Sequence, residues 1–173
     1  AFDVIPSPAS QMLTLFTLPT RNVSSVYIIP TRRQPMSPTL FTPFTLASGQ
    51  TLRNRIAKAA MEEGLAGPGQ APDDRLIALY HRWGVGGAGV LITGNVMVHA
   101  EALTGPGGVV LDANSPLEPF VKWAKAGKAG GTKMWMQISH PGRQVNANMP
   151  GVVWGPSDVA VDVGKHSKRF GRP

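Results

Sequence analysis

The sequence between residues 55 and 139 alternates short apolar segments with longer segments of helical period. The short segments, residues 55–60, 90–93 and 133–139, have the length and composition of buried strands. A helical segment separates each of them from the next. Parallel strands need such crossovers, which are nearly always right-handed, so the order β, α, β, α, β predicts a parallel sheet in an α/β protein.

A β-hairpin is expected ahead of these units. Residues 40–46 alternate in polarity, residues 47–50 form a turn signal, and residues 51–53 supply a second short strand.

Both expected helices have start and stop signals. Asp73 is a plausible N-cap, and its helix should end in the glycines of residues 84–89. Residues 115–118, Ser-Pro-Leu-Glu, resemble a capping box with proline at the first helical position, and Gly130–Gly131 should end that helix. The apolar faces are expected at Leu76, Ile77, Leu79, Tyr80 and Trp83 in the first helix and at Leu117, Phe120, Val121 and Ala124 in the second.

Residues 84–89 also match the dinucleotide-binding pattern G-x-G-x-x-G letter for letter. That pattern works when a strand precedes it and a helix follows, because the pyrophosphate sits on the helix N-terminus. Here a helix precedes and a strand follows. We therefore interpret these glycines as a helix stop and a tight turn.

Three strands and two helices leave both outer strands with unpaired edges. A (β/α)8 barrel built from units of this length needs roughly 300 residues. A flavodoxin-like sheet needs two further strands. On either topology, the chain is expected to be part of a longer fold, truncated after about three strands.

Residues 1–35 have a different composition, with eight Ser/Thr, five Pro and no sustained period. We expect a disordered leader or an upstream extension before Met36, with residues 36–173 as the folded part. An Arg-containing, Ser-rich, acid-poor leader is also typical of a mitochondrial transit peptide, but its prolines disfavour the amphipathic helix of an import signal. A cytoplasmic location is therefore expected, with a mitochondrial one as the alternative.

Charge and cysteine content exclude several classes of function. Most of the net charge of +7 lies in residues 1–35 and 164–173, so the central part has no basic stripe for nucleic acid. The longest apolar run, residues 84–98, is interrupted by polar residues and is shorter than the ~20 residues of a membrane span. The chain has no cysteine, and no metal site is expected.

Three blocks at the ends of the expected strands carry a family resemblance. Residues 52–61, Leu-Arg-Asn-Arg-Ile-Ala-Lys-Ala-Ala-Met, follow an L-x-N-R pattern, and residues 86–95 and 137–143 (Gln-Ile-Ser-His-Pro-Gly-Arg) come later in the same order. Together they resemble the Old Yellow Enzyme family, in its NADH:flavin oxidoreductase or ene-reductase branch. The resemblance covers about residues 38–145. It implies the N-terminal portion of an FMN-binding (β/α)8 TIM barrel whose bottom is plugged by the hairpin.

The resemblance also implies a reaction. NAD(P)H reduces FMN, and the flavin then gives hydride to an activated alkene such as an α,β-unsaturated carbonyl compound. The family's catalytic residues follow its fourth strand, so they are expected beyond residue 173 and the isolated chain is expected to be inactive. A full-length homo-oligomer is possible. Two alternatives remain, namely a non-catalytic scaffold without flavin and the start of a dienoyl-CoA reductase or amine dehydrogenase-like FMN barrel.

The same resemblance gives the cofactor-binding residues. Ala59, Ala60 and Met61 match a segment whose backbone packs against the flavin, Asn95 matches a position beside the ring, and Gln137 matches a glutamine that bonds the pyrimidine side. Met61 and Asn95, like His140, lie at the carboxyl ends of expected strands, where barrel active sites are built. Gln137 is expected to be buried, and its amide supplies both a donor and an acceptor.

Glu62 departs from the family, which usually has threonine or cysteine there to bond the flavin. A carboxylate facing the ring would disfavour the reduced flavin anion, so it should be protonated or turned away.

His81, His99 and His166 are expected to be solvated or structural. His140 and Arg143 belong to the third block and are expected to anchor a loop.

Overall fold

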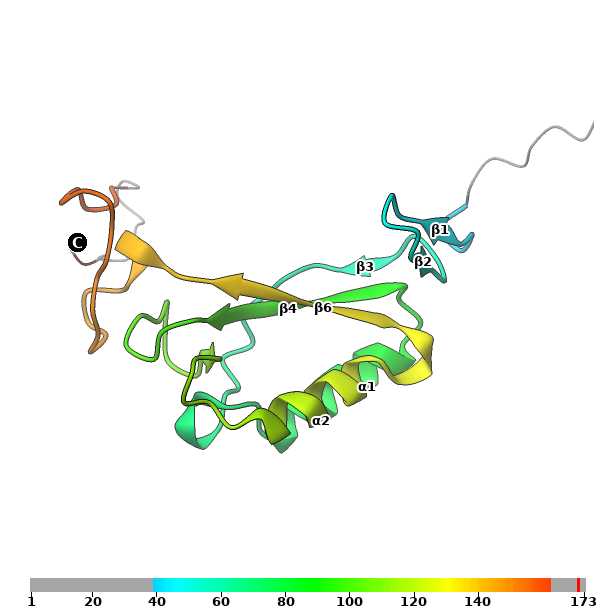
Figure 1. Ribbon diagram of the computed structural model, residues 1–173, viewed down its shortest axis with the longest axis horizontal. Helices are drawn as coiled ribbons and strands as arrows, with labels where there is room; N and C mark the ends of the chain where they lie inside the picture. The colour runs from blue at the N-terminus through cyan, green and yellow to red at the C-terminus, as the bar shows by residue number, and fades with distance from the viewer. Residues whose placement is uncertain (1–38, 163–170, 172–173) are drawn as a thin grey trace, which may run out of the picture. The chain divides into compact units, whose positions relative to one another are not determined.

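In the computed structural model, residues 39–162 and residue 171 are described (Figure 1). The expected leader, residues 1–35, lies outside them. The hairpin is present: β1 (Phe44–Thr45) pairs antiparallel with β2 (Thr51–Leu52), and the main-chain N–H of Leu46 donates to the oxygen of Gln50 at 2.8 Å. The prediction of a hairpin is confirmed, although its strands are shorter than expected.

A parallel sheet follows, made of β3 (Ala57–Lys58), β4 (Val90–Met97), β5 (Val109–Val110) and β6 (Lys133–Ser139). β6 pairs with β4 along its length, so β3 and β5 share the other edge, one at each end of β4. The predicted parallel sheet is confirmed. β3 is shorter than expected, β4 is longer, and β5 was missed because a strand of two residues shows no period.

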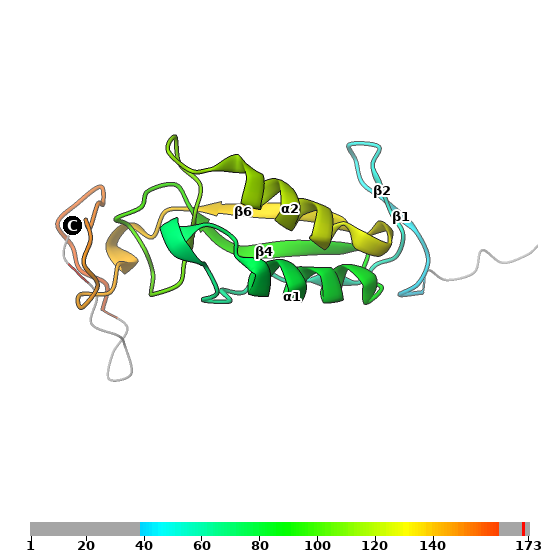
Figure 2. The same cartoon turned by 90° about the horizontal axis from the view of Figure 1, so that it is seen from below.

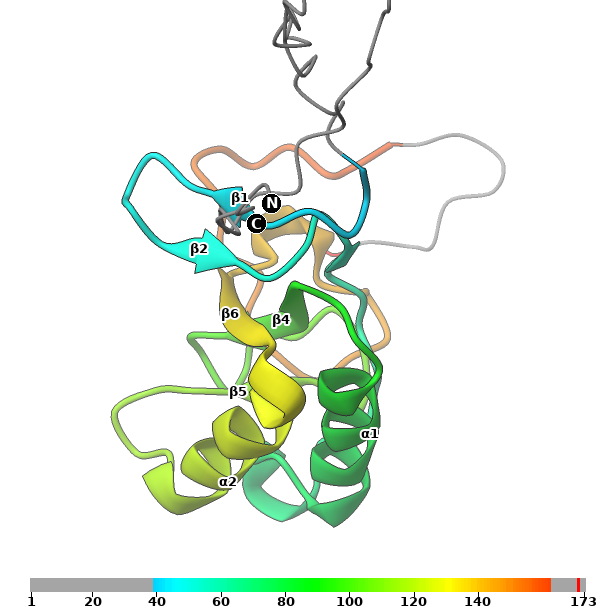
Figure 3. The same cartoon turned by 90° about the vertical axis from the view of Figure 1, so that its right-hand side faces the viewer.

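Two helices, α1 (Asp74–Val85) and α2 (Leu117–Gly127), lie side by side on one face of this sheet (Figures 2 and 3). The core between the helices and the sheet consists of Leu76, Tyr80, Leu91, Val96, Val109, Phe120 and Trp123. The Tyr80 ring meets Trp123 edge to face, with 4.9 Å between centroids. In the described part of the chain, no helix covers the opposite face of the sheet.

The start of α1 is as predicted, but the start of α2 is not. Asp73 Oδ1 accepts from the main-chain N–H groups of Arg75 and Leu76, at 3.0 and 3.1 Å. The expected capping box at Ser115 is wrong: Pro116 precedes α2, and no described side chain caps the helix. The Ser115 hydroxyl instead belongs to the turn before the helix, where it accepts from the Asp112 main-chain N–H at 2.9 Å.

The buried face of α2 also differs from the expectation. Phe120, Trp123 and Gly127 are buried, whereas Leu117 and Val121 are 66% and 50% exposed. The cause is a close approach of the two helices at Gly84. A Cβ there would lie 2.8 Å from the carbonyl oxygen of Ala126.

Gly84 was expected to belong to the helix stop and is instead a buried part of α1. Gly86 caps the helix, and its main-chain N–H donates to Trp83 O at 3.1 Å. A helix precedes this glycine run and β4 follows it. That order confirms that the dinucleotide interpretation was rightly rejected. Two further short 3-10 turns, η2 (Ala129–Gly131) and η3 (Gly142–Gln144), flank β6, and η1 (Pro68–Gln70) precedes α1.

Candidate functional site

The candidate site is built around an irregularity in β4. Ile92 pairs with Trp135, and the next paired residues are Asn95 and Gln137, so β4 uses three steps where β6 uses two. One extra residue in a strand shifts the alternation of all later side chains. The bulge therefore brings Asn95 onto the same face as Gln137, opposite the helices.

Gly94 lies in this bulge because another segment crosses it. A Cβ on Gly94 would meet the carbonyl oxygen of Met61 at 2.2 Å and the Glu63 carboxylate at 2.5 Å. No residue with a side chain fits at these distances. Glycine at this position thus allows the segment after β3, residues 59–63, to leave the sheet and pass directly over β4.

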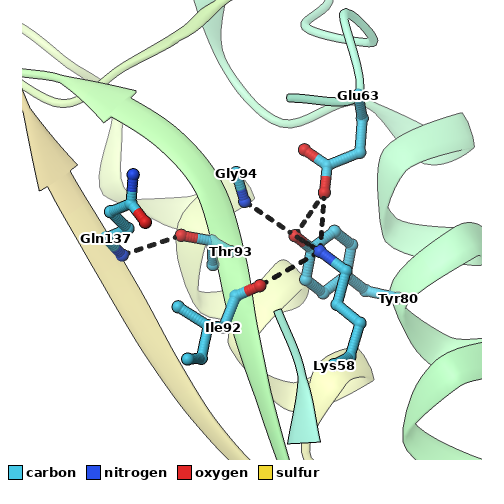
Figure 4. Close-up of polar contacts among 7 residues, drawn as sticks. All are labelled: Lys58, Glu63, Tyr80, Ile92, Thr93, Gly94 and Gln137. Carbon is cyan, nitrogen blue, oxygen red and sulfur yellow. Dashed lines mark hydrogen bonds and ion pairs between the residues drawn. The ribbon is translucent and has the colours of Figure 1, made fainter. Parts of the chain in front are cut away.

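A buried polar cluster holds this crossing from the helix side (Figure 4). The Lys58 ammonium donates to Glu63 Oε1 at 3.2 Å and to the Ile92 carbonyl oxygen at 3.0 Å. The Tyr80 hydroxyl donates to Glu63 Oε1 at 2.6 Å and accepts from the Gly94 main-chain N–H at 3.2 Å. The cluster thus connects β3, α1, the crossing segment and the bulge of β4.

The charges of this cluster are largely shielded from solvent. The side chains of Lys58 and Glu63 are 10% and 9% exposed, and the Lys58 ammonium also lies 4.5 Å from the centre of the Trp83 ring. Burial, and then the hydrogen bond and charge of Glu63, raise the pKa of Tyr80 above its ordinary value. Tyr80 therefore remains a neutral hydroxyl donor. Sequence reasoning missed this cluster, although a lysine within an apolar strand was a usable signal.

The predicted residues Asn95 and Gln137 are in contact. The Gln137 side-chain amide donates to Asn95 Oδ1, and the Gln137 main-chain N–H donates to Thr93 Oγ1 at 2.9 Å. Gln137 was expected to be buried and is exposed, because this face of the sheet has no cover among the described residues.

Glu62 is exposed and lies between Asn95 and the loop after β4. Its Oε1 accepts from Asn95 Nδ2 at 3.2 Å and from the Thr104 hydroxyl. A cavity of about 40 Å³ lies beside it, lined by Glu62, Glu63, Asn95 and the glycine-rich loop of residues 105–108. Such a space has room for water but not for a ring-sized ligand.

The predicted segment Ala59–Met61 is available to a ligand. Ala59 and Met61 are exposed, and the backbone of Ala60 and Met61 makes no hydrogen bond to other described residues. The small side chains let a planar ligand approach the main chain. The polar edge of an isoalloxazine ring carries both hydrogen-bond donors and acceptors. The unbonded backbone groups of Ala60 and Met61, and the amide of Gln137 two strands away, can pair with such an edge. The residues present therefore fit a flavin.

Two histidines lie near each other at the same end of the sheet. His99 follows β4 and His140 follows β6, with 6.4 Å between ring centres. Each Nδ1 accepts a backbone N–H, from Glu101 at 3.2 Å and from Gly142 at 3.1 Å. Both rings thus stabilise turns, as expected for structural histidines. His166 lies outside the described residues.

Other kinds of site find no support in the described ranges. Residues 39–162 contain no group of three or more His, Cys, Asp or Glu side chains placed to hold a metal ion. None of the helices described is long and apolar enough to cross a bilayer.

A model of the NADH:flavin oxidoreductase / NADH oxidase family matches residues 39–171. The chain belongs to this family. The NADH-dependent flavin oxidoreductase iliE of Hypocrea jecorina (strain QM6a) is 40% identical over 106 residues, which cover 59% of this chain and 26% of that protein. The NADH:fumarate oxidoreductase of Klebsiella pneumoniae (strain 342) is 30% identical over 112 residues, which cover 65% of this chain and 12% of that protein.

The fold is similar to that of a solved Old Yellow Enzyme. The enzyme from Trypanosoma cruzi superposes with a TM-score of 0.67 at 20% identity, covering 78% of this chain and 41% of that one. The likeness confirms the predicted fold class, the N-terminal units of a (β/α)8 barrel, and the family match confirms the predicted flavin oxidoreductase family. The chain spans about a quarter of the length of the Hypocrea jecorina relative.

Proposed function

We propose that residues 39–162 form the first β/α units of an FMN-dependent NADH oxidoreductase and supply the floor and one edge of its flavin site. The observation that carries the proposal is the open face of the sheet. There the unbonded backbone of Ala60 and Met61 lies at the same end as the Asn95–Gln137 pair. The family match supports a flavin as the ligand.

FMN, when bound, accepts hydride from a nicotinamide and passes it to an electron-poor substrate. The residues of this chain bind and orient the ring. Ala59 and Ala60 present the main chain at short range, and Met61 covers the ring from solvent. Gln137 offers a donor and an acceptor to the polar edge, with Asn95 holding its side chain.

For the substrate we propose an alkene conjugated to a carbonyl or carboxylate group. The Klebsiella pneumoniae relative is named for fumarate, which is such an alkene. Groups that hold the substrate and supply its proton are proposed to come from later barrel units, at the same carboxyl-terminal face. The isolated 173-residue chain is therefore proposed to be inactive, because the FMN phosphate also needs backbone amides and a helix N-terminus from those units. Tight FMN binding or turnover by the isolated chain would contradict this.

The proposal is tested with Gln137→Leu in the complete oxidoreductase. The change keeps most of the side-chain volume but leaves flavin polar atoms unpaired, at a cost of ~1–3 kcal/mol. The FMN dissociation constant, measured by flavin fluorescence, should rise ~10–100-fold. The matched control is Gln144→Leu in η3, whose side chain bonds no other described residue, and it should leave the constant unchanged. A protein that takes up no FMN would support the scaffold alternative instead.

A further inference from the structure

A line of hydrogen bonds runs across the open face from Glu62 through Asn95 to Gln137. Asn95 Nδ2 donates to Glu62 Oε1 at 3.2 Å, and the Gln137 amide nitrogen donates to Asn95 Oδ1. The Thr104 hydroxyl donates to the same Glu62 oxygen. The main-chain bond from Gln137 to Thr93 Oγ1 keeps this end of β6 against the bulge. Three side chains from three different segments are therefore joined by hydrogen bonds, and in each bond the donor points toward Glu62.

The direction of this line is set by its first member. An ionised carboxylate can only accept hydrogen bonds, whereas an amide has a donating and an accepting end of nearly the same shape. Beside Glu62, Asn95 must turn its NH2 group toward the carboxylate and its oxygen toward Gln137. Gln137 must then turn its own NH2 group toward Asn95.

One acceptor remains at the end of the line. The side-chain oxygen of Gln137 has no donor among the residues that the structure describes, and the residue is exposed. We propose that Glu62 is a positioning residue, whose carboxylate orients both amides so that Gln137 presents an oxygen acceptor to the ring imide N–H of the flavin. This proposal rests on the proposed function.

The inference also explains the departure at position 62. A threonine hydroxyl can donate as well as accept, so it would not force one orientation on Asn95. The Glu62 oxygen that bonds Asn95 also accepts from the Thr104 hydroxyl in the loop after β4, so both of its donors in the described part of the chain are neutral groups of the protein. Glu62 thus acts on the flavin through two neutral amides.

The test compares FMN with 3-methyl-FMN, which lacks the imide N–H, in the complete oxidoreductase. An oriented acceptor on Gln137 should give FMN an advantage of about tenfold in dissociation constant, the effect of one hydrogen bond. In Glu62→Gln either end of the new amide can face Asn95, so only about half of the molecules present the acceptor and the advantage should fall about twofold, to about fivefold. The control Glu101→Gln removes a charge near the same end of the sheet, where the Glu101 carboxylate bonds no other described residue, and should keep the full advantage.

A double variant tests orientation separately from charge. Glu62→Gln/Asn95→Asp moves the carboxylate one place along the line, where it accepts from both neighbours and again forces the NH2 group of Gln137 inward. The full preference for FMN should return. An unchanged preference in Glu62→Gln, or a preference that is lowered and not rescued by the double variant, overturns the proposal.

A second measurement needs no flavin. In the 173-residue chain, the side-chain amide protons of Asn95 and Gln137 should both shift in the NMR spectrum of Glu62→Gln and not in that of Glu101→Gln. If neither amide responds to Glu62→Gln, the line does not exist as described. A complete enzyme that binds neither flavin would refute the proposed function alone, and the amide signals would still decide the orientation.

Discussion

Replacing Lys58 with methionine leaves the Glu63 carboxylate without its cation in a site that is about nine-tenths buried. The ammonium nitrogen and the carboxylate oxygen are 3.2 Å apart. At an effective dielectric constant of about 20, two unit charges at that distance attract by about 5 kcal/mol. An unpaired buried charge typically costs about 3–5 kcal/mol. The free energy of unfolding of Lys58→Met should therefore fall by about 3–5 kcal/mol in urea denaturation followed by tryptophan fluorescence.

The double variant Lys58→Met/Glu63→Gln distinguishes an ion pair from ordinary packing. It removes both charges and keeps an oxygen that accepts from the Tyr80 hydroxyl, so it should be more stable than Lys58→Met alone. The interaction free energy between the two positions, obtained from the double-mutant cycle, should be about 1–3 kcal/mol. As a control, Lys122→Met breaks an exposed pair on α2 and should hardly change stability. Additive losses in the double variant would refute the reasoning, and recovery of folding by the double variant would support it even if Lys58→Met does not fold.

Two further predictions concern the same region. Gly94→Ala should push the crossing segment off β4, because its Cβ would overlap the Met61 carbonyl oxygen. The free energy of unfolding should fall by more than about 3 kcal/mol. A variant as stable as the parent would contradict the crossing. The raised pKa of Tyr80 means that the folded state holds this proton more tightly than the unfolded state, so the contribution of Tyr80 to stability should be constant below about pH 10 and should be lost as the pH rises further. In a Tyr27→Phe background, which leaves Tyr80 as the sole tyrosine, ultraviolet absorbance should show no phenolate at about pH 11 until the chain unfolds.

The parts of the fold that local chemistry decides were predictable. Asp73 caps α1 and residues 133–139 form β6, because a capping carboxylate and an apolar run act within a few residues. The end of β3 was not predictable, since the run of apolar residues continues to Met61, and residues 59–63 leave the sheet where Gly94 lets them cross β4. The apolar residues of α2 would allow either of two faces to be buried. The close contact with Gly84 of α1, which is distant in sequence, decides which face is buried.

The site divides in the same way. The resemblance to a family assigned Asn95 and Gln137 to cofactor binding, and the two residues lie on strands that parallel pairing brings together. Their contact, however, depends on the bulge, since without the extra residue Asn95 would face the helices. The bulge is held by Tyr80 and Lys58, which come from other elements, and no local pattern reveals that arrangement.

The crossing at Gly94 couples the position of residues 59–63 rigidly to that of β4. A soft side chain between two backbones can change rotamer and absorb a displacement, but here the carbonyl of Met61 rests on β4 with nothing compressible between them. A shift of residues 59–63, the proposed floor of the flavin site, is therefore passed directly to Gly94 and to Asn95, the next residue along the strand. Stiffness of this kind favours a fixed geometry over adaptation, so substitutions in residues 59–63 should alter the proposed floor and the proposed edge of the flavin site together.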